Sequence, residues 1–208
     1  ELLEGHPDVH MAPEKEPAYF TKYWATRQID WYADQFAGAG DEAAIGEATV
    51  EYMVDPRAPE RIRQVLPHVR IIFVLREPTA RAWSHYWHRV KMGEERRDLD
   101  TVIDEDGTDA YPVRYGLYHQ HLERFREHFP WSQIQVLIME ELLEQLPESL
   151  SPVLRHINVA DDYRPPSSGP SNVSAMPRVR LLSQVSARIR RAERLKAVLP
   201  DRVHRSAR

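Results

Sequence analysis

The stretch from Val69 to Val90, VRIIFVLREPTARAWSHYWHRV, constrains the fold more than any other part of the chain. Its first seven residues, Val69 to Leu75, form a nearly unbroken apolar run that is rich in β-branched side chains. That pattern is typical of a strand buried on both faces. The sequence then changes at once to Arg76, Glu77 and Pro78, and Pro78 suits a turn or the first position of a helix. We therefore predict a central parallel strand followed directly by a helix.

The predicted helix carries hydrogen-bond donors on one face. Arg81, Ser84, His85 and His88 fall at i, i+3, i+4 and i+7, and apolar residues fill the other face. Ligands of open α/β sheets bind at the carboxyl ends of strands, and helix N-termini attract phosphate. An arginine that ends a strand and a serine on the next helix therefore indicate an anion site. The alternative is an arginine that caps the strand end and a serine that faces solvent.

The pattern Arg76-x-Pro78-x-x-Arg81-x-x-Ser84-x-Tyr86 resembles the segment of sulfotransferases that grips the 3'-phosphate of 3'-phosphoadenosine 5'-phosphosulfate. The resemblance implies that Arg76 and Ser84 contact this phosphate, with Arg81 as a further candidate. It also implies a three-layer α/β, P-loop-NTPase-like fold whose mainly parallel central sheet is flanked by helices. The implied sulfuryl donor leaves as adenosine 3',5'-bisphosphate, and the implied mechanism needs no metal.

Length and composition set wider limits. A chain of 208 residues has room for one domain, and we expect a single domain over residues 1–208. A hydrophobic fraction of 42% with 29% charged residues is ordinary for a soluble protein, and no apolar run approaches a membrane span. The absence of cysteine excludes thiolate catalysis and fits a reducing compartment, so we expect a cytoplasmic location. The ten histidines show no metal-binding spacing.

The segment HPDVHMAPEKEPAYF resembles a stretch of the bacterial and heparan-type sulfotransferases that reads roughly HPxV...KExxxF. In those relatives, a strand and a Gly-Thr-rich loop just before it cradle the 5'-phosphosulfate. The 208 residues contain no such loop. We therefore expect the domain to be incomplete at its N-terminus, and this chain alone to bind the nucleotide weakly and to catalyse poorly.

The resemblance implies that Glu16 is the general base that takes the proton of the acceptor, and that Lys15 helps to neutralise the sulfonate. The role suits the chemistry, because a loose transition state needs positioning, charge stabilisation and one base. The alternative is that Glu14, Lys15 and Glu16 are a solvated charge cluster in a proline-bounded loop. Four histidines are rival bases, namely His6, His10, His85 and His88.

Candidate acceptor contacts come from three places. Aromatic residues crowd the range 19–36, and Tyr19 and Phe20 are candidates for the wall of an acceptor pocket, with packing in the core as the alternative. His85 is a further candidate. The segment GEATVEYM resembles the family pattern GE(K/A)(S/T)PxY, in which Glu47 would orient the donor or the acceptor. Ala48 and Val50 depart from the lysine of heparan-type members and from the common proline.

The remaining periodicities predict helices over 56–66, 115–129 and 147–159 and a second buried strand over 134–139. The pattern GLYxxxLxxFxxxFPxxQIxVLxxEEL closely resembles the corresponding part of sulfotransferases. Residues 92–107 are strongly charged, and we expect a mobile surface loop there, with a short helix around residues 99–103. In relatives this region often covers the acceptor.

The C-terminal part is basic, since residues 178–208 contain ten Lys or Arg and two acidic residues. We predict a terminal helix with a solvated basic face, and we expect no nucleic-acid partner. Before it, residues 161–176 are rich in Pro, Ser and Gly. Relatives place here a loop that closes over the nucleotide, which makes Ser171, Asn172 and Arg178 candidate contacts. A plain linker is the alternative.

The sequence thus predicts a sulfotransferase that moves a sulfuryl group from 3'-phosphoadenosine 5'-phosphosulfate to a hydroxyl or amine of a glycan, lipid or small molecule. One alternative is an inactive binding module that keeps the 3'-phosphate site. Another is a P-loop small-molecule kinase. The kinase would need a lysine-bearing phosphate loop and an acidic Mg²⁺ ligand, and neither is visible in the sequence.

Overall fold

A computed structural model describes residues 2–165. These residues divide into two compact units, the first made of residues 2–77 and 117–165 and the second of residues 78–116. No helix in this part of the chain is long and apolar enough to cross a membrane. The expectation of one domain over residues 1–208 stays a prediction, because residues 166–208 lie outside the described part.

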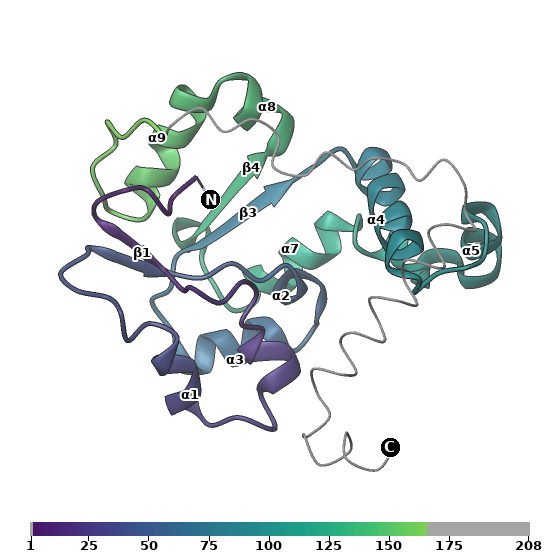
Figure 1. The fold of residues 1–208 in the computed structure, drawn as a ribbon, viewed down its shortest axis with the longest axis horizontal. Helices are drawn as coiled ribbons and strands as arrows, with labels where there is room; N and C mark the ends of the chain where they lie inside the picture. Colours follow the sequence, from purple (N-terminus) through teal and green to yellow (C-terminus); the bar gives the residue numbers. More distant parts are fainter. Residues whose placement is uncertain (1, 166–208) are drawn as a thin grey trace, which may run out of the picture. The chain divides into compact units, whose positions relative to one another are not determined.

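The first unit contains two pairs of parallel strands. β1 (Val9–Met11) pairs with β2 (Ala44–Gly46), and β3 (Ile71–Leu75) pairs with β4 (Ile134–Ile138), so that Phe73 lies opposite Val136. β3 and β4 run side by side with their arrows in the same direction (Figure 1). The predicted α/β class with parallel strands is confirmed. Within residues 2–165 the strands form these two pairs instead of one continuous sheet.

Helices cover both faces of the β3–β4 pair. On one face, Phe73 of β3 meets Phe125 of α7 (Tyr118–Arg126) edge to face at 4.9 Å. On the other face, Ile72 and Leu137 pack against the buried apolar residues of α9 (Leu146–His156). The pair therefore forms the middle layer between α7 and α9, as the three-layer fold requires.

The expected burial of β3 on both faces is only partly correct. Phe73 and Leu75 are buried, whereas Val74 is 50% exposed. Successive side chains of a strand point to opposite faces, so Val74 shares a face with Ile72. α9 covers that face at Ile72 but not at Val74, near the carboxyl end of the strand.

The first unit also contains short helices that connect its strands. The predicted helix over 56–66 is α3 (Ala58–Val65), which starts with Pro59 in its first turn and buries Ile62. The predicted helices over 115–129 and 147–159 are α7 and α9, each shorter than expected. The others are η1 (Tyr19–Tyr23), α1 (Ile29–Asp34), α2 (Glu51–Val54), η3 (Trp131–Gln133) and α8 (Met139–Glu144).

Aromatic side chains dominate the core of the first unit. Tyr19, Phe20 and Tyr32 pack into one buried cluster with Phe73, Phe125 and residues of α3. The rings of Tyr19 and Tyr32 are stacked at 4.9 Å, and Phe20 meets Tyr32 edge to face at 5.1 Å. Such pairs stabilise a core beyond the burial of their area.

The second unit is helical. It contains α4 (Pro78–Met92), α5 (Leu99–Asp106), η2 (Gly107–Asp109) and α6 (Tyr111–Arg114). α4 begins at Pro78 and follows β3 in the chain, as predicted. Tyr86 and Val90 of α4 and Val102 of α5 are buried.

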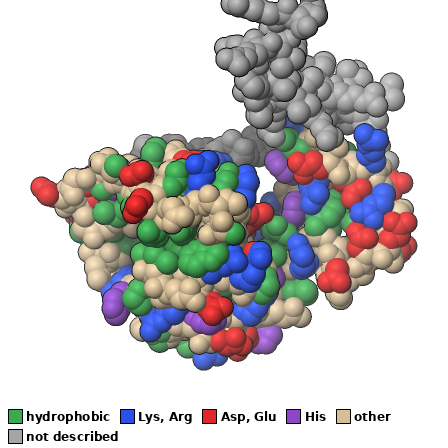
Figure 2. All heavy atoms as spheres, turned by 90° about the horizontal axis from the view of Figure 1, so that it is seen from below, with side chains coloured by type: hydrophobic (Ala, Val, Ile, Leu, Met, Phe, Trp, Pro, Cys, Tyr) green, Lys and Arg blue, Asp and Glu red, His purple; other side chains and the backbone are tan. Residues whose placement is uncertain are grey.

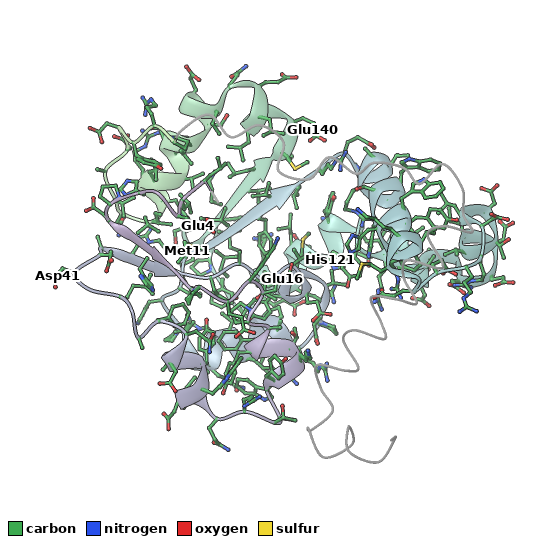
Figure 3. The ribbon with its side chains drawn as sticks, viewed as in Figure 1. Glu4, Met11, Glu16, Asp41, His121 and Glu140 are labelled. Carbon is green, nitrogen blue, oxygen red and sulfur yellow. The ribbon has the colours of Figure 1, made fainter. Side chains whose placement is uncertain are left out.

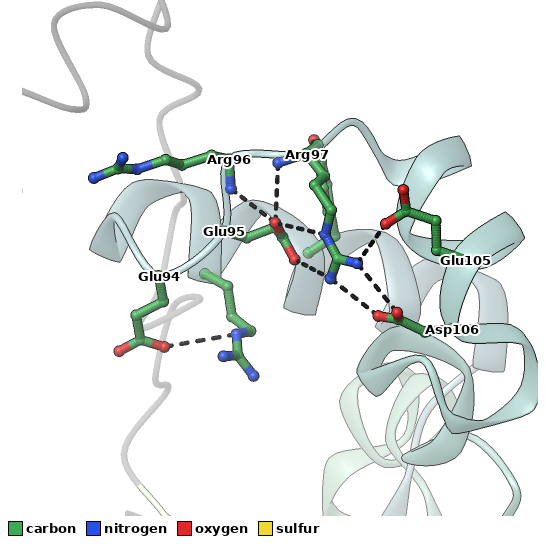
Figure 4. Close-up of polar contacts among 8 residues, drawn as sticks. Glu94, Glu95, Arg96, Arg97, Glu105 and Asp106 are labelled. Atoms are coloured by element: carbon green, nitrogen blue, oxygen red, sulfur yellow. Dashed lines mark hydrogen bonds and ion pairs between the residues drawn. The ribbon is translucent and has the colours of Figure 1, made fainter.

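Arg97 organises the charged segment 92–107 (Figure 4). Its guanidinium donates to Glu95, to Glu105 at 3.0 Å and to both carboxylate oxygens of Asp106 at 3.0 and 3.1 Å. The same cation lowers the pKa of Glu95 to about 2. The segment predicted as a mobile surface loop with a short helix contains a longer helix, α5. The hydrogen bonds from Arg97 to Glu105 and Asp106 hold the last turn of α5 to the residues that precede the helix.

Candidate functional site

Charged side chains follow the carboxyl end of every strand in the first unit. Lys15 and Glu16 lie beyond β1, Glu47 directly follows β2, Arg76 directly follows β3, and Glu140 lies in the first turn of α8 after β4. Figure 3 shows the Glu16 and Glu140 side chains beyond the strands that precede them. The carboxyl ends of parallel strands are where open α/β sheets bind ligands. We therefore take these ends as the candidate site.

The loop after β1 is exposed and its backbone is strained. The side chains of Glu14, Lys15 and Glu16 are exposed, which agrees with both a solvated cluster and a reactive base. The φ angles are 57° at Glu16 and 53° at Ala18, although neither residue is glycine. Left-handed backbone at such residues costs free energy, and it persists only where the surroundings impose it. A merely solvated charge cluster would need no such conformation.

Glu47 is held inside the unit by hydroxyl groups. Its Oε1 accepts hydrogen bonds from the hydroxyls of Tyr32 at 3.1 Å and Tyr52 at 2.7 Å, and its Oε2 accepts one from Thr49 at 2.6 Å. Burial, followed by the Glu47 charge, raises the pKa of Tyr32 and of Tyr52 above the ordinary value. Both phenols therefore stay protonated donors. The predicted contact of Glu47 with donor or acceptor remains untested, but both of its oxygens have partners inside the protein.

Tyr19 and Phe20 belong to the core. Phe20 is 1% exposed and Tyr19 is buried among aromatic rings. The core interpretation of the aromatic stretch is thus confirmed for these two residues. Neither presents appreciable side-chain surface to an acceptor in this structure.

Arg76 lies beside Glu140, an acidic residue that was not among the predicted site residues. Its Nε is 3.9 Å from Oε1 of Glu140, and the same oxygen accepts the backbone N–H of Glu77 at 3.2 Å. The Tyr118 hydroxyl donates to the Arg76 carbonyl at 2.9 Å, which ties the end of β3 to α7. The Arg76 side chain is 38% exposed. A partly exposed guanidinium with one distant counter-ion suits the binding of an anion.

The remaining phosphate-binding candidates of the described chain lie on α4 in the second unit. Ser84 is exposed, as a ligand contact would require. The Arg81 guanidinium donates to the Pro112 carbonyl and to Nδ1 of His85 at 3.4 Å. Arg81 therefore already ties α4 to α6, so it has a structural role whether or not it also binds phosphate.

His85 is half-buried between two tyrosine rings. The Tyr111 and Tyr115 rings meet its imidazole edge to face, at 5.0 and 4.8 Å. Burial, and next the charge of Arg81, lowers the pKa of His85 to about 4. The imidazole is therefore neutral near pH 7, and because Nδ1 accepts from Arg81, the proton resides on Nε2.

Three sequence-predicted contacts, Ser171, Asn172 and Arg178, lie outside the described residues, as does the predicted basic helix over 178–208. Within residues 2–165, no group of three or more His, Asp or Glu side chains is arranged to hold a metal ion.

On the face that Figure 2 shows, Lys and Arg side chains lie among Asp and Glu side chains. Fields of a single sign are therefore broken up on that face.

Sequence reasoning did not identify Glu140 as a neighbour of Arg76, or the Tyr32, Thr49 and Tyr52 hydroxyls as hydrogen-bond donors to Glu47. A signal for Glu140 was present, since it follows the second predicted strand as Arg76 follows the first. The hydroxyl network gave a weaker signal in the spacing of Glu47, Thr49 and Tyr52. Only the tertiary fold adds Tyr32 from α1.

Comparison with known proteins identifies the family. The family model described as "Sulfotransferase domain" matches residues 1–182. Human heparan sulfate glucosamine 3-O-sulfotransferase 5 is 29% identical over 159 residues, which cover 71% of this chain and 46% of that protein. Human heparan sulfate glucosamine 3-O-sulfotransferase 6 is 31% identical over 148 residues, which cover 69% of this chain and 43% of that protein. The chain thus spans less than half the length of these curated relatives.

A solved structure supports the fold. The crystal structure of a sulfotransferase from Alicyclobacillus acidocaldarius superposes with a TM-score of 0.73 at 24% identity. The match covers 83% of this chain and 79% of that one. Together with the family match over most of the sequence, this likeness agrees with the strand pairing and helix layers described above. The chain belongs to the sulfotransferase domain family.

Proposed function

We propose that this chain is the catalytic part of a sulfotransferase that uses 3'-phosphoadenosine 5'-phosphosulfate as the sulfuryl donor. The acceptor that we propose first is a glycan hydroxyl or amine, because the names of the similar curated proteins specify heparan sulfate glucosamine. Lipid and small-molecule acceptors are the alternatives. The observation that carries the proposal is Glu16, an exposed carboxylate held in a left-handed backbone conformation beyond the end of β1.

In the proposed reaction, the Glu16 carboxylate takes the proton of the acceptor O–H or N–H. The acceptor atom then forms its bond to sulfur as the bond between sulfur and the bridging phosphate oxygen breaks. The electron pair of that bond leaves with adenosine 3',5'-bisphosphate. An exposed carboxylate suits this role because it can reach the acceptor. The adjacent Lys15 would balance negative charge on the transferring group.

Arg76, Ser84 and Arg81 are the proposed contacts of the 3'-phosphate. Arg76 fits best, because its guanidinium is partly exposed at a strand end and its counter-ion lies at 3.9 Å. Ser84 offers an exposed hydroxyl on α4. Arg81 would have to share its guanidinium between the phosphate and the Pro112 carbonyl. Ser171, Asn172 and Arg178 stay proposed contacts, as does His85 for the acceptor.

The decisive test follows transfer of labelled sulfate to heparan-type oligosaccharides by wild type and by Glu16→Gln, in this chain and in the longest natural protein that contains it. Glu14→Gln is the matched control, because Glu14 is an exposed acid of the same loop. We expect Glu16→Gln to lower the rate by about 100-fold or more, the usual contribution of a general base, and Glu14→Gln to leave it unchanged. Transfer by Glu16→Gln at the wild-type rate would overturn the assignment.

Calorimetric titration with adenosine 3',5'-bisphosphate tests the donor separately. We expect binding that weakens in Arg76→Ala, and weaker binding of adenosine 5'-monophosphate, which lacks the 3'-phosphate. Binding without transfer by either protein would favour the inactive binding module. Neither binding nor transfer would reject the proposed function.

A further inference from the structure

The hydrogen bonds around Glu47 have a fixed direction. The hydroxyls of Thr49 and Tyr52 each donate their single hydrogen to the Glu47 carboxylate, whose oxygens accept it. Both hydroxyl oxygens then face their other neighbours as acceptors. The Glu47 carboxylate thus orients two hydroxyl oxygens so that each can accept a further hydrogen bond on its outer side.

Those two acceptor positions are filled by the backbone of the segment that follows Glu16. The Thr49 Oγ1 accepts the N–H of Ala18 at 3.3 Å, and the Tyr52 hydroxyl oxygen accepts the N–H of Phe20 at 3.5 Å. Glu47 is therefore connected to this segment through two separate bridges. The third hydroxyl on Glu47, that of Tyr32, donates to the carboxylate but forms no bridge to this backbone within residues 2–165.

The bridged segment is the strained one. Ala18 has a positive φ, and so does Glu16, which is two positions earlier. Pro17 between them is buried and restricts the backbone further. The packing of Tyr19 on Tyr32 and the bond from Arg61 to the Phe20 carbonyl, at 2.9 Å, hold the segment from other sides. Strained backbone needs such multiple restraints, and the two Glu47 bridges are among them.

We infer that Glu47 is a positioning residue for Glu16. Through Thr49 and Tyr52 it fixes the amides of Ala18 and Phe20, and so keeps the Glu16 carboxylate in one place. The inference rests on the proposed role of Glu16 as the base. Under this inference, Glu47 arranges the loop that carries Glu16, in place of the predicted contact with donor or acceptor.

The chain offers matched variants for each bridge. Thr49→Val removes the hydroxyl at nearly constant shape, whereas Thr49→Ser keeps it. Tyr52→Phe removes a bridging hydroxyl, whereas Tyr32→Phe removes a hydroxyl that binds the same carboxylate without reaching the loop. In each pair, one variant removes a bridging hydroxyl and the other keeps both bridges.

We expect Thr49→Val and Tyr52→Phe to lower kcat by about tenfold or more, with little change in KM for the acceptor or in the affinity for adenosine 3',5'-bisphosphate. Thr49→Ser keeps the bridging hydroxyl and Tyr32→Phe removes a hydroxyl that forms no bridge, so both should retain kcat within about threefold of wild type. Thermal unfolding of each variant checks that the fold is kept. Wild-type kcat in both bridge variants would overturn the inference.

A double variant separates positioning from a general loss of structure. If Thr49 acts through Glu16, then Thr49→Val should cause no further loss in the Glu16→Gln background. Multiplied losses would reject the inference. If Glu16→Gln itself keeps full activity, the proposed role of Glu16 as the base fails, and the positioning role fails with it. If Glu16→Gln is inactive and the bridge variants are not, only the positioning role fails.

Hydrogen exchange gives a readout that needs no turnover. The Ala18 amide should exchange faster in Thr49→Val than in Thr49→Ser, and the Phe20 amide faster in Tyr52→Phe than in Tyr32→Phe. Equal exchange rates within each pair would show that the bridges do not restrain the loop, and would overturn the inference. This test holds even if the protein shows no turnover.

Discussion

Glu140 lies 3.9 Å from Arg76 at the end of the β3–β4 pair, so the proposed 3'-phosphate ligand already has a counter-ion. The Glu140 carboxylate is kept there by the Glu77 N–H, while its Oε2 is buried and has no hydrogen-bond partner among the described residues. Glu140 thus has an incomplete set of partners next to a guanidinium. An incoming phosphate would compete with Glu140 for Arg76 and would also be repelled by it.

The first prediction is that Glu140→Gln tightens the binding of adenosine 3',5'-bisphosphate. The amide can still accept from Glu77 but carries no charge. Exposed ion pairs are weak, so we expect an increase between about 1.5-fold and fivefold, which corresponds to about 0.2–1 kcal/mol. Calorimetric titration measures it, with the exposed neighbour in Glu141→Gln as the control. Unchanged or weaker binding would show that Glu140 does not oppose the ligand.

The second prediction concerns acid stability and His85. Its pKa is about 4 in the folded protein, below the ordinary value of 6.5, chiefly because of burial. Between these two pH values, His85 binds a proton in the unfolded chain but not in the folded protein. The free energy of unfolding therefore falls as the pH is lowered through this window. We expect His85→Gln to lose less stability than wild type between pH 7 and pH 5.

Urea unfolding at the two pH values measures this difference. His88→Gln is the control, because His88 is exposed on the same helix. A wild-type pH dependence in His85→Gln would mean that other groups cause the acid sensitivity. Glu95 also loses its stabilising contribution in acid, but only as the pH falls from about 4.5 towards its own pKa of about 2.

The strands and the main helices could be predicted because their signals are local. The apolar run that became β3 and the periodicity of α7 lie within single stretches of sequence. The conformation of the Glu16 loop could not be predicted in this way. Ala18 has none of the features that favour positive φ, and its restraint comes from Thr49, 31 residues away in sequence. Sequence resemblance marked Glu16 and Glu47 as important, and the fold was needed to connect them.

The third prediction concerns Arg97, whose guanidinium joins Glu95, Glu105 and Asp106. Lysine has the same charge but cannot reproduce the planar set of donors, so Arg97→Lys should lose part of the network. Glu95 is nearly buried and would keep a poorly paired charge. We expect the thermal midpoint to fall by a few degrees in Arg97→Lys and to stay unchanged in Arg96→Lys, which alters an exposed neighbour. Equal midpoints would show that the network adds no stability.

The fourth prediction concerns His6, which joins parts of the first unit that are 154 residues apart. Its Nδ1 accepts the N–H of Asp8 at 3.0 Å, so Nε2 carries the proton and donates to the Ala160 carbonyl at 2.9 Å. The ring is buried and packs against Tyr163 at 4.9 Å. His6→Ala leaves both backbone groups without this partner, which costs about 1–3 kcal/mol when the groups stay buried.

Chemical denaturation measures this loss against His68→Ala, which removes an exposed histidine. We expect a lower free energy of unfolding in His6→Ala and no change in His68→Ala. His6→Ala should also speed the hydrogen exchange of the Asp8 amide. If His6→Ala were as stable as wild type, the segment after α9 would be held by its apolar contacts alone. Those contacts are made by Ile157, Val159 and Tyr163 with the buried residues of α9.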